Sequence, residues 1–399
     1  MTVSTLDIPN EIPDRSGSWG GVLAISVCAF ALVASEFLPV SLLTPIANDL
    51  SITEGMAGQG IAISGAFAVL TSLLISSLAG NLNRKTLLLG LTAAMGVSGA
   101  VVALAPNYFA YMLGRALIGV VIGGFWSMSA ATAMRLVPSR DVPRALAIIN
   151  GGNALATVVA APLGAWLGTF IGWRGAFLCL VPIALIALAW QWKALPSMEA
   201  TAHPPGLGNV FTLLKRPGVC VGMLASSLFF MGQFSLFTYV RPFLETVTGV
   251  HAPHISLVLL VMGAAGFIGT LLIGRALQRR FYQTLVVIPL LMTLTALTLV
   301  AFGDWLAVVV ALLGLWGVAG TSAPVGWWAW VALVFPKDAE AGGGLFVAVV
   351  QLSIALGSTL GGLLFDHSGY QATFFASAAI LLVSAFLTIL TAQSKASAG

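Results

Sequence analysis

Two residues of opposite charge, Glu36 and Arg115, lie inside long apolar stretches of this 399-residue chain, in "ALVASEFLPVSLLTP" and "YMLGRALIGVVIGGFWSM". A charge at the centre of a membrane helix costs roughly 2.5 to 3.5 kcal/mol, so it normally finds a partner or a hydrated cavity. Burial disfavours a charged carboxylate and a nearby guanidinium favours it, so a glutamate under both influences can bind and release a proton. These residue types therefore predict reversible protonation of Glu36, with Arg115 as its partner.

Each of the two residues also has a simpler interpretation. Arg115 lies near enough to a helix end for its side chain to extend to the lipid headgroups. Glu36 would only hold helices together if its carboxyl stayed protonated.

At about 1.5 Å per residue, both Glu36 and Arg115 lie roughly 12 to 16 Å from the same membrane face, on spans that run in opposite directions. We therefore expect the two side chains to meet.

The composition predicts a membrane around these charges. The chain is 59% hydrophobic and 8% charged, with a mean hydropathy of +1.01, whereas soluble domains carry about 25% charged residues. Many apolar stretches reach the roughly 20 residues that cross a bilayer as a helix, and none alternates as a membrane β-strand does. The expected fold class is an all-α membrane protein with twelve transmembrane helices in two pseudo-symmetric six-helix bundles. The expected spans are 19–47, 55–80, 86–105, 109–136, 143–168, 174–194, 217–246, 254–278, 284–302, 304–334, 343–365 and 371–392.

The basic residues predict how these spans are oriented. Alternate connections carry most of them, such as Arg84 with Lys85 and Arg279 with Arg280, whereas the other connections are mainly acidic and hold Arg174 and Arg241. Cytoplasmic loops carry the excess of Lys and Arg, so both termini are expected in the cytoplasm. The N-terminus lacks the basic region of a cleavable signal. We therefore expect a multi-pass membrane protein.

A proline-rich polar segment near the middle of the chain divides it into two halves. The expected domains are a cytoplasmic N-terminal tail (1–18), an N-terminal six-helix bundle (19–194), a cytoplasmic linker (195–216), a C-terminal six-helix bundle (217–392) and a cytoplasmic tail (393–399).

The two halves resemble each other at a shift of 197 residues. "GWRGAF", which begins at Gly172, falls on "GYQATF", which begins at Gly369. The same shift carries Gly164 onto Gly361, Pro45 onto Pro242 and Arg140-Asp141 onto Lys337-Asp338. Transporters are commonly built from such repeats, which rock around a site at the bilayer midplane. A multi-span scaffold is the alternative, but it would not need polar groups at that depth.

The repeat also relates the first and seventh spans. Glu36 falls on Gln233 and Ser41 on Thr238, so both spans carry polar groups at one level and are expected to face each other across the axis between the halves. Because the second half carries an amide in place of the acid, proton coupling is assigned to the first half.

Enzyme chemistry and metal binding are not expected. The chain has no Walker-type phosphate loop, no HExxH and no GxSxG. Its four histidines and three cysteines lack metal-ligand spacing, and Cys28, Cys179 and Cys220 are interpreted as small apolar residues of the spans. No catalytic residue, metal or cofactor is therefore predicted.

Several motifs resemble the twelve-span drug:proton antiporters of the major facilitator superfamily, over essentially the whole chain. "EFLPVSLLTPIANDL" resembles the first-span motif of that family, and "GRALIG" resembles the fourth-span motif, whose arginine, here Arg115, is associated with proton coupling. "AAPLG", which contains Pro162 and Gly164, is similar to the fifth-span antiporter motif, with Ala161 where glycine is usual. The resemblance implies alternating access driven by protons.

The loop between the second and third spans departs from the family pattern. It reads "GNLNRK", with Gly80, Arg84 and Lys85 kept and Asn83 at the position where the family carries an aspartate. These residues, with Pro162 and Gly164, are expected to act in the conformational change, and Asn83 puts the usual cytoplasmic charge latch in doubt.

Amides, hydroxyls and aromatic rings form the rest of the expected site. No further charge is expected inside the membrane, so a neutral solute with a flat face and hydrogen-bonding groups fits best. The tryptophans of the tenth span are also explained by packing. The candidates for substrate binding are Ser41, Trp126, Ser129, Asn153, Gln233, Phe234, Thr238, Trp327 and Gln351.

The segments "GGFWSMSA", "PVGWW" and "VAVVQL" resemble sequences of the bacterial purine ribonucleoside exporters within this family. Sugar exporters share parts of these segments. That resemblance implies efflux of inosine and guanosine against inward proton flow. A sugar or multidrug exporter and an uncoupled facilitator are the alternatives. The expected partners are the substrate, protons and the lipid bilayer, with no nucleic acid, and the protein is expected to be a monomer.

Overall fold

The computed structural model describes residues 18–80, 82–199, 217–335 and 339–396, and the regular elements of this part of the chain are all helices. In the first half they are α1 (Trp19–Leu50), α2 (Glu54–Ala79), α3 (Arg84–Ala103), α4 (Tyr108–Leu136), the 3-10 turn η1 (Ser139–Asp141), α5 (Val142–Leu178) and α6 (Leu180–Ala194). In the second half they are α8 (Pro217–Phe237), α9 (Val240–Thr246), α10 (Ala252–Phe302), α11 (Leu306–Val334) and α12 (Ala339–Ala396).

Short polar residues begin several of the helices. The side chain of Thr53 accepts a hydrogen bond from the backbone N–H of Met56 at 3.1 Å, and that of Asn107 accepts one from Ala110 at 3.0 Å. Such caps satisfy amides that have no partner within the helix. At the end of α1, Ser51 adopts a left-handed conformation and its N–H returns to the last turn. These helices therefore begin or end at local signals, while their interiors are set by apolar composition.

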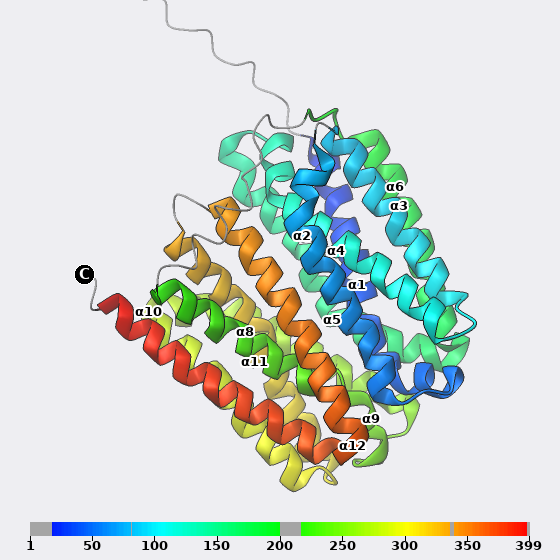
Figure 1. Ribbon diagram of the computed structural model, residues 1–399, viewed down its shortest axis with the longest axis vertical. Helices are drawn as coiled ribbons and strands as arrows, with labels where there is room; N and C mark the ends of the chain where they lie inside the picture. The colour runs from blue at the N-terminus through cyan, green and yellow to red at the C-terminus, as the bar shows by residue number, and fades with distance from the viewer. Residues whose placement is uncertain (1–17, 81, 200–216, 336–338, 397–399) are drawn as a thin grey trace, which may run out of the picture.

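Nine helical stretches in the described residues are long and apolar enough to cross a membrane. Three of them, Arg144–Ala194, Ala252–Phe302 and Gly342–Gln393, have 51 or 52 residues. Because a span needs about 20 residues, each is long enough for two crossings. The backbone leaves helical geometry within them at Gly172, Arg280 and Gly369, and division there would raise nine stretches to twelve. Figure 1 shows α12 turning back on itself in this way. The count of twelve crossings stays a prediction.

The internal repeat is visible in the backbone. Gly172 (φ 70°, ψ 171°) and Gly369 (φ 77°, ψ −177°) lie 197 positions apart and adopt the same conformation, which L residues with a side chain rarely take. In the first half α5 packs on α1, and in the second half α12 packs on α8. Gly164 and Gly361 allow these two close approaches, because a Cβ would come within 2.6 Å of the Ser41 Oγ and 2.3 Å of the Ser235 O, respectively. The predicted duplication is therefore a structural one.

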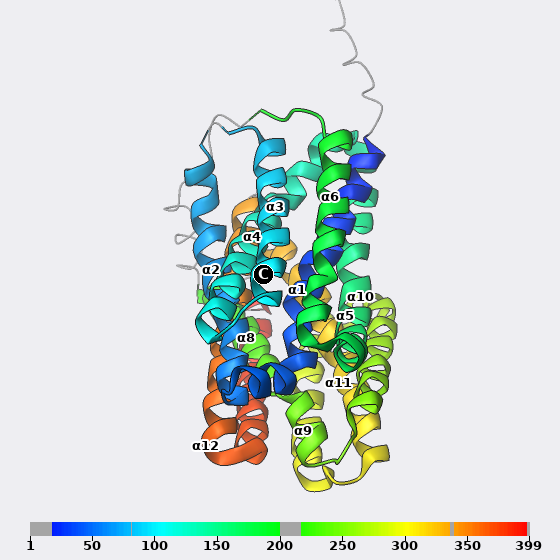
Figure 2. The ribbon, with the colours of Figure 1, turned by 90° about the vertical axis from the view of Figure 1, so that its right-hand side faces the viewer.

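The helices of each half gather in one bundle (Figures 1 and 2). We call the end near residues 18, 83, 136 and 195 the linker end, and the end near residues 51, 105, 249, 303 and 366 the distal end. The two halves are in contact through α2 with α12 and through α5 with α10. Figure 1 shows the first limb of α12, in orange, beside α2 toward the distal end.

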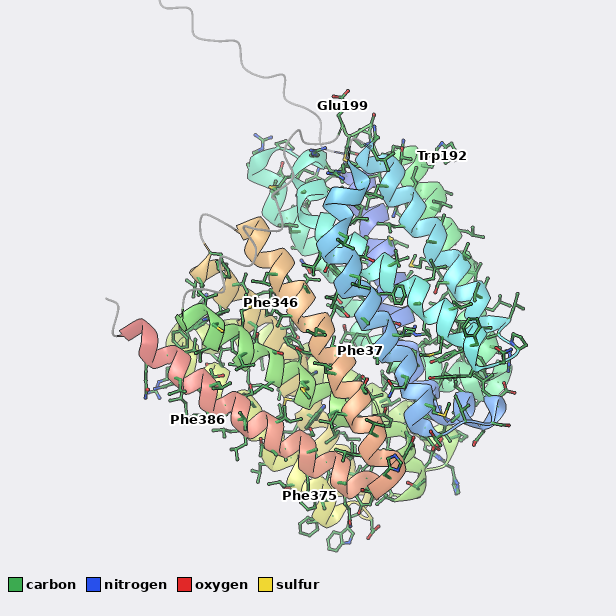
Figure 3. The ribbon with its side chains drawn as sticks, in the orientation of Figure 1. Phe37, Trp192, Glu199, Phe346, Phe375 and Phe386 are labelled. Atoms are coloured by element: carbon green, nitrogen blue, oxygen red, sulfur yellow. The ribbon has the colours of Figure 1, made fainter. Side chains whose placement is uncertain are left out.

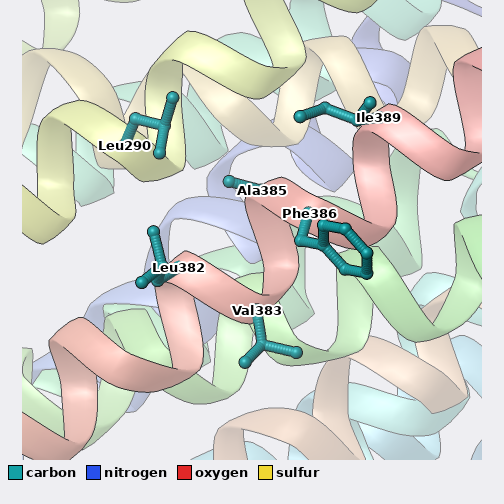
Figure 4. A pocket seen from close by; sticks show the side chains of 6 residues that line it. All are labelled: Leu290, Leu382, Val383, Ala385, Phe386 and Ile389. Atoms are coloured by element: carbon teal, nitrogen blue, oxygen red, sulfur yellow. The ribbon is translucent and has the colours of Figure 1, made fainter.

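Large apolar side chains cover the outside of the bundles (Figure 3). Phe170 is 70% exposed and Trp192 is 69% exposed, as is expected of side chains that face lipid rather than water. The groove in Figure 4, between α10 and α12, is lined by Leu290, Leu382, Val383, Ala385, Phe386 and Ile389. It has no polar lining side chain, so it belongs to the lipid-facing surface and not to a site for a polar solute.

Parts of the predicted organisation lie outside the described residues. These are residues 1–17 of the N-terminal tail, residues 200–216 of the linker, Lys337-Asp338 of the repeat, and residues 397–399. The start of the predicted linker packs on the first bundle, where Leu195 and Met198 are buried in its core.

Candidate functional site

Glu36 lies where the two halves meet. It is half-buried on α1, and its carboxylate oxygen Oε1 accepts a hydrogen bond from Nε2 of Gln351 on α12 at 3.3 Å. Gln351 itself is only 7% exposed. The acid that the sequence places in the first half therefore bonds to an amide of the second half.

Arg115 is fully buried, which excludes extension of its side chain to the headgroups. Its Nη1 donates to the backbone carbonyl of Ser35 at 2.8 Å, and its Nε donates to that of Gly60 at 3.0 Å. The predicted ion pair with Glu36 is not formed in the described structure. Arg115 instead binds the carbonyl of Ser35, the residue that precedes Glu36.

Pro39 explains why the carbonyl of Ser35 needs this arginine. A proline inside a helix has no N–H for the carbonyl four residues earlier, and for Pro39 that carbonyl belongs to Ser35. A buried acceptor left without a donor costs about 1–3 kcal/mol. Arg115 supplies the donor, so it fixes α1 directly beside Glu36.

Phe37 and Phe234 mark the axis between the halves. They are equivalent under the shift of 197 residues, and their ring centroids are 6.2 Å apart. Phe37 also meets Phe237 edge-on at 5.8 Å, and Figure 3 labels Phe37 near the boundary between the bundles. The prediction that the first and seventh spans face each other is confirmed at this level.

Gln233, the repeat equivalent of Glu36, binds within its own half. Its Nε2 donates to the carbonyl of Gly320 at 3.4 Å, and this carbonyl is the one that Pro324 leaves without a helical donor. Its Oε1 is buried and has no hydrogen-bond partner in the described structure. The amide is thus oriented, with one acceptor left over.

The other substrate candidates differ in their burial and in their hydrogen-bond partners. Trp126 and Asn153 are half-buried, and the Ser129 hydroxyl donates to the Trp126 carbonyl at 3.1 Å. The Ser41 hydroxyl donates to the carbonyl of Leu38 at 3.0 Å. Thr238 is buried and shares a hydrogen bond with Ser358 at 3.0 Å.

Trp327 is packed within the second half. It is 1% exposed, belongs to the core cluster of that half and meets Trp330 edge-on at 5.8 Å. This position agrees with the packing interpretation of the tenth-span tryptophans.

The conformational motif at the linker end has a structural partner. The Asn83 side-chain oxygen begins α3 by accepting from Lys85 N at 2.9 Å, and it also accepts from Met198 N at 3.1 Å. Its Nδ2 donates to the Ser197 hydroxyl at 2.5 Å, and the Arg84 N–H donates to the Met198 carbonyl at 2.8 Å. Gly80, with φ of 44°, ends α2. In place of the family's aspartate, Asn83 holds the segment that follows α6.

Pro162 lies opposite the second half. The carbonyl that it frees belongs to Val158, and Gly263 of α10 approaches this carbonyl so closely that a Cβ on Gly263 would come within 2.5 Å of it. The fifth span, which is predicted to act in the conformational change, therefore contacts the second half at this position.

Arg241 is a buried charge that sequence reasoning assigned to a loop. It is 4% exposed near the start of α9, and its Nε donates to Glu245 at 2.9 Å. Its Nη1 donates to the backbone carbonyl of Ser41 in the other half. The signal in the sequence was Pro45, which frees this same carbonyl.

Further polar contacts join the halves at the distal end. The Asp366 carboxylate on α12 accepts from the Thr53 hydroxyl at 2.6 Å and from the Gly55 N–H at 2.9 Å, at the start of α2. The Thr359 hydroxyl donates to Gln59 at 3.1 Å. A carboxylate at a helix N-terminus is favourable because the first amides are unpaired and the helix dipole is positive there. The structure therefore holds the distal end closed.

Two related helical halves that meet around a polar axis, with lipid-facing side chains outside, define a multi-pass membrane transporter. Residues 25–341 match the Major Facilitator Superfamily, and the chain belongs to this family. Its fold and family are those of transporters and not of enzymes.

Named relatives carry two different descriptions. The chain is 83% identical, over all of both sequences, to the "Transcription regulatory protein OpdE" of Pseudomonas aeruginosa. It is 39% identical, over 93% of both sequences, to the "Purine ribonucleoside efflux pump NepI" of Salmonella typhimurium.

Solved structures share the fold at low identity. A mutant of the nucleoside transporter NupG gives a TM-score of 0.76 at 14% identity, covering 93% of this chain and 98% of that one. A bacterial homologue of the human lysosomal transporter Spinster gives 0.75 at 15% identity, covering 96% and 98%.

Proposed function

We propose that the protein exports purine ribonucleosides such as inosine and guanosine across the bacterial inner membrane in exchange for protons. The observation that carries the proposal is the 39% identity, over 93% of both chains, to a protein named as a purine ribonucleoside efflux pump. The polar axis supports it, because it offers amides and aromatic rings to a neutral solute. We further propose that both termini are cytoplasmic and that the protein acts as a monomer.

Glu36 is proposed to couple protons to this movement. Its carboxylate accepts a hydrogen bond from Gln351 of the other half, and the bond weakens when a proton neutralises the carboxylate. Protonation then changes how firmly the halves are joined at this level. By linkage, the arrangement of the halves changes the proton affinity of Glu36 in return.

Gln233 is proposed to recognise the base. Its Nε2 is held by the carbonyl of Gly320, and its Oε1 has no partner in the described structure. A purine base carries N–H groups that can donate to such an acceptor. Phe37 and Phe234 offer aromatic faces on which a flat ring can stack.

The test is uptake of radiolabelled inosine into inverted membrane vesicles with an imposed pH gradient. We expect gradient-driven uptake that a proton uncoupler abolishes. Glu36→Gln should lose this gradient-driven uptake and keep inosine exchange at equal pH, because an amide cannot release a proton. Glu54→Gln, on the half-exposed first turn of α2, is the matched control and should behave as the wild-type protein does.

Three results would change the proposal. Uptake that ignores the uncoupler in the wild-type protein would indicate a facilitator. Gradient-driven uptake that survives in Glu36→Gln would remove this residue from proton coupling. Failure with every nucleoside, together with transport of a sugar or a cationic drug, would assign one of the alternative substrates.

The name of the Pseudomonas aeruginosa relative describes a regulator of transcription. A transporter changes transcription when it alters the intracellular concentration of a regulatory solute. We propose that route for this chain rather than contact with DNA, because its basic residues are expected in the short connections on one face of a membrane. Glu36→Gln, correctly inserted in the membrane, would then abolish any transcriptional effect together with gradient-driven transport.

A further inference from the structure

Two prolines of α1 each free a carbonyl, and two arginines bind the carbonyls that result. Pro39 frees the carbonyl of Ser35, which Arg115 of the same half binds. Pro45 frees the carbonyl of Ser41, which Arg241 of the other half binds. The first bond fixes α1 within its own bundle, whereas the second joins the two bundles.

The position of Arg241 makes its bond sensitive to movement of the halves. Glu245, one turn later on α9, accepts from Arg241 Nε at 2.9 Å and orients the guanidinium. Only 5% of the Arg241 side chain is exposed, so the bond to Ser41 is protected from water while the halves stay together. If α1 and α9 move apart, the carbonyl of Ser41 loses its donor, because Pro45 offers none within the helix.

We propose that Arg241 is a gate residue of the transport cycle, which stabilises the closed distal end by binding the carbonyl that Pro45 frees. The bond breaks each time the distal end opens. The proposal requires two alternating arrangements of the halves and does not depend on which solute is carried.

The experiment measures distances between spin labels in the purified full-length protein, starting from a variant whose three cysteines are replaced by alanine. Labels at Leu104→Cys and Trp305→Cys, which are 75% and 65% exposed, report on the distal ends of the two halves. Labels at Trp192→Cys and Leu333→Cys, which are 69% and 52% exposed, report on the linker side.

Arg241→Gln should raise the ratio of the distal-open to the distal-closed population about tenfold, because it removes a charge-assisted donor. The pair on the linker side should report the reciprocal closure, which a loss of folding would not produce. Arg241→Lys keeps a cationic donor and should give a smaller change. Arg174→Gln is the matched control, because Arg174 binds Asp49 and the Ala105 carbonyl within its own half, and it should leave both distributions unchanged.

Pro45→Ala tests the stated cause. Alanine restores the N–H that the Ser41 carbonyl lacks, so Arg241→Gln should change the distal distances much less in this background. The wild-type protein, Arg241→Gln, Pro45→Ala and the double variant form a double-mutant cycle. This cycle separates the interaction between Arg241 and the Ser41 carbonyl from the effect of any bend that Pro45→Ala removes. Unchanged distal distances in Arg241→Gln, or an equal change in both backgrounds, would overturn the proposal. Failure of inosine transport alone would leave it intact, because these distances are measured without substrate.

Discussion

Individual prolines of the spans leave carbonyls without helical donors, and side chains of other helices bind several of them. Arg115 binds the carbonyl freed by Pro39, and Gln233 binds the carbonyl freed by Pro324. Each such bond fixes the side chain as well as the helix. Polar residues that the sequence presents as ligands or proton carriers are therefore also structural partners of bent helices.

Replacement of Arg115 by lysine should show this double role. Lysine keeps the positive charge but lacks the fork that reaches the carbonyls of both Ser35 and Gly60. We expect Arg115→Lys to destabilise the protein by about 1–3 kcal/mol, measured as a lower midpoint of thermal unfolding in detergent. Pro39→Ala restores an amide donor for Ser35, so the loss should be smaller in that background. An equal loss of stability in both backgrounds would show that the destabilisation does not come from the Ser35 carbonyl.

At the scale of elements, single non-helical residues divide the long helices α5 and α12 into two limbs each. Gly172 and Gly369 occupy equivalent positions of the repeat and adopt backbone angles that only glycine takes readily. At each, the chain changes direction from one apolar helix to the next without a long loop.

Alanine at Gly172 or Gly369 should therefore be destabilising by similar amounts in the two halves. Backbone strain of this kind costs about 1–3 kcal/mol, and thermal unfolding of the two single variants measures it. Gly151→Ala is the control, because Gly151 is helical and a Cβ there would meet open space. That variant should be neutral or stabilised by about 0.5–1 kcal/mol. Wild-type stability in Gly172→Ala would contradict the assignment of strain to this position.

At the scale of the whole molecule, several contacts between the halves involve backbone groups. Arg241 and Asp366 of the second half bind backbone groups of α1 and α2, and Gly263 brings α10 against α5. Contacts to backbone groups depend little on side-chain identity in the opposite half. The closed distal end therefore rests on close approach of helix backbones.

Valine at Gly263 should prevent that approach. A Cβ at this position would come within 2.5 Å of the Val158 carbonyl oxygen, so Gly263→Val should shift the labels at positions 104 and 305 toward longer distances. Gly274→Val on the same helix is the control, because a Cβ there would meet nothing within 4 Å. If the two variants gave the same distance distribution, the contact between α5 and α10 would not control closure.

The sequence by itself determined the membrane class, the helices and the duplication. A bilayer forces each span to satisfy its own backbone hydrogen bonds, so apolar length alone indicates a helix. The repeat then related Gly172 to Gly369 and Phe37 to Phe234, and the structure shows the same backbone in the first pair and ring contact in the second. The sequence also placed Glu36 on a span that faces the axis between the halves.

Only the tertiary structure decided which side chains meet. Glu36 bonds to Gln351, 315 residues away, and not to Arg115. Arg241 is buried between the halves, whereas Trp327 packs inside one of them. The physical reason is that the spans are apolar on nearly all sides, so their sequences specify neither rotation nor tilt. Those depend on close approach at glycines and on the carbonyls that prolines leave without donors.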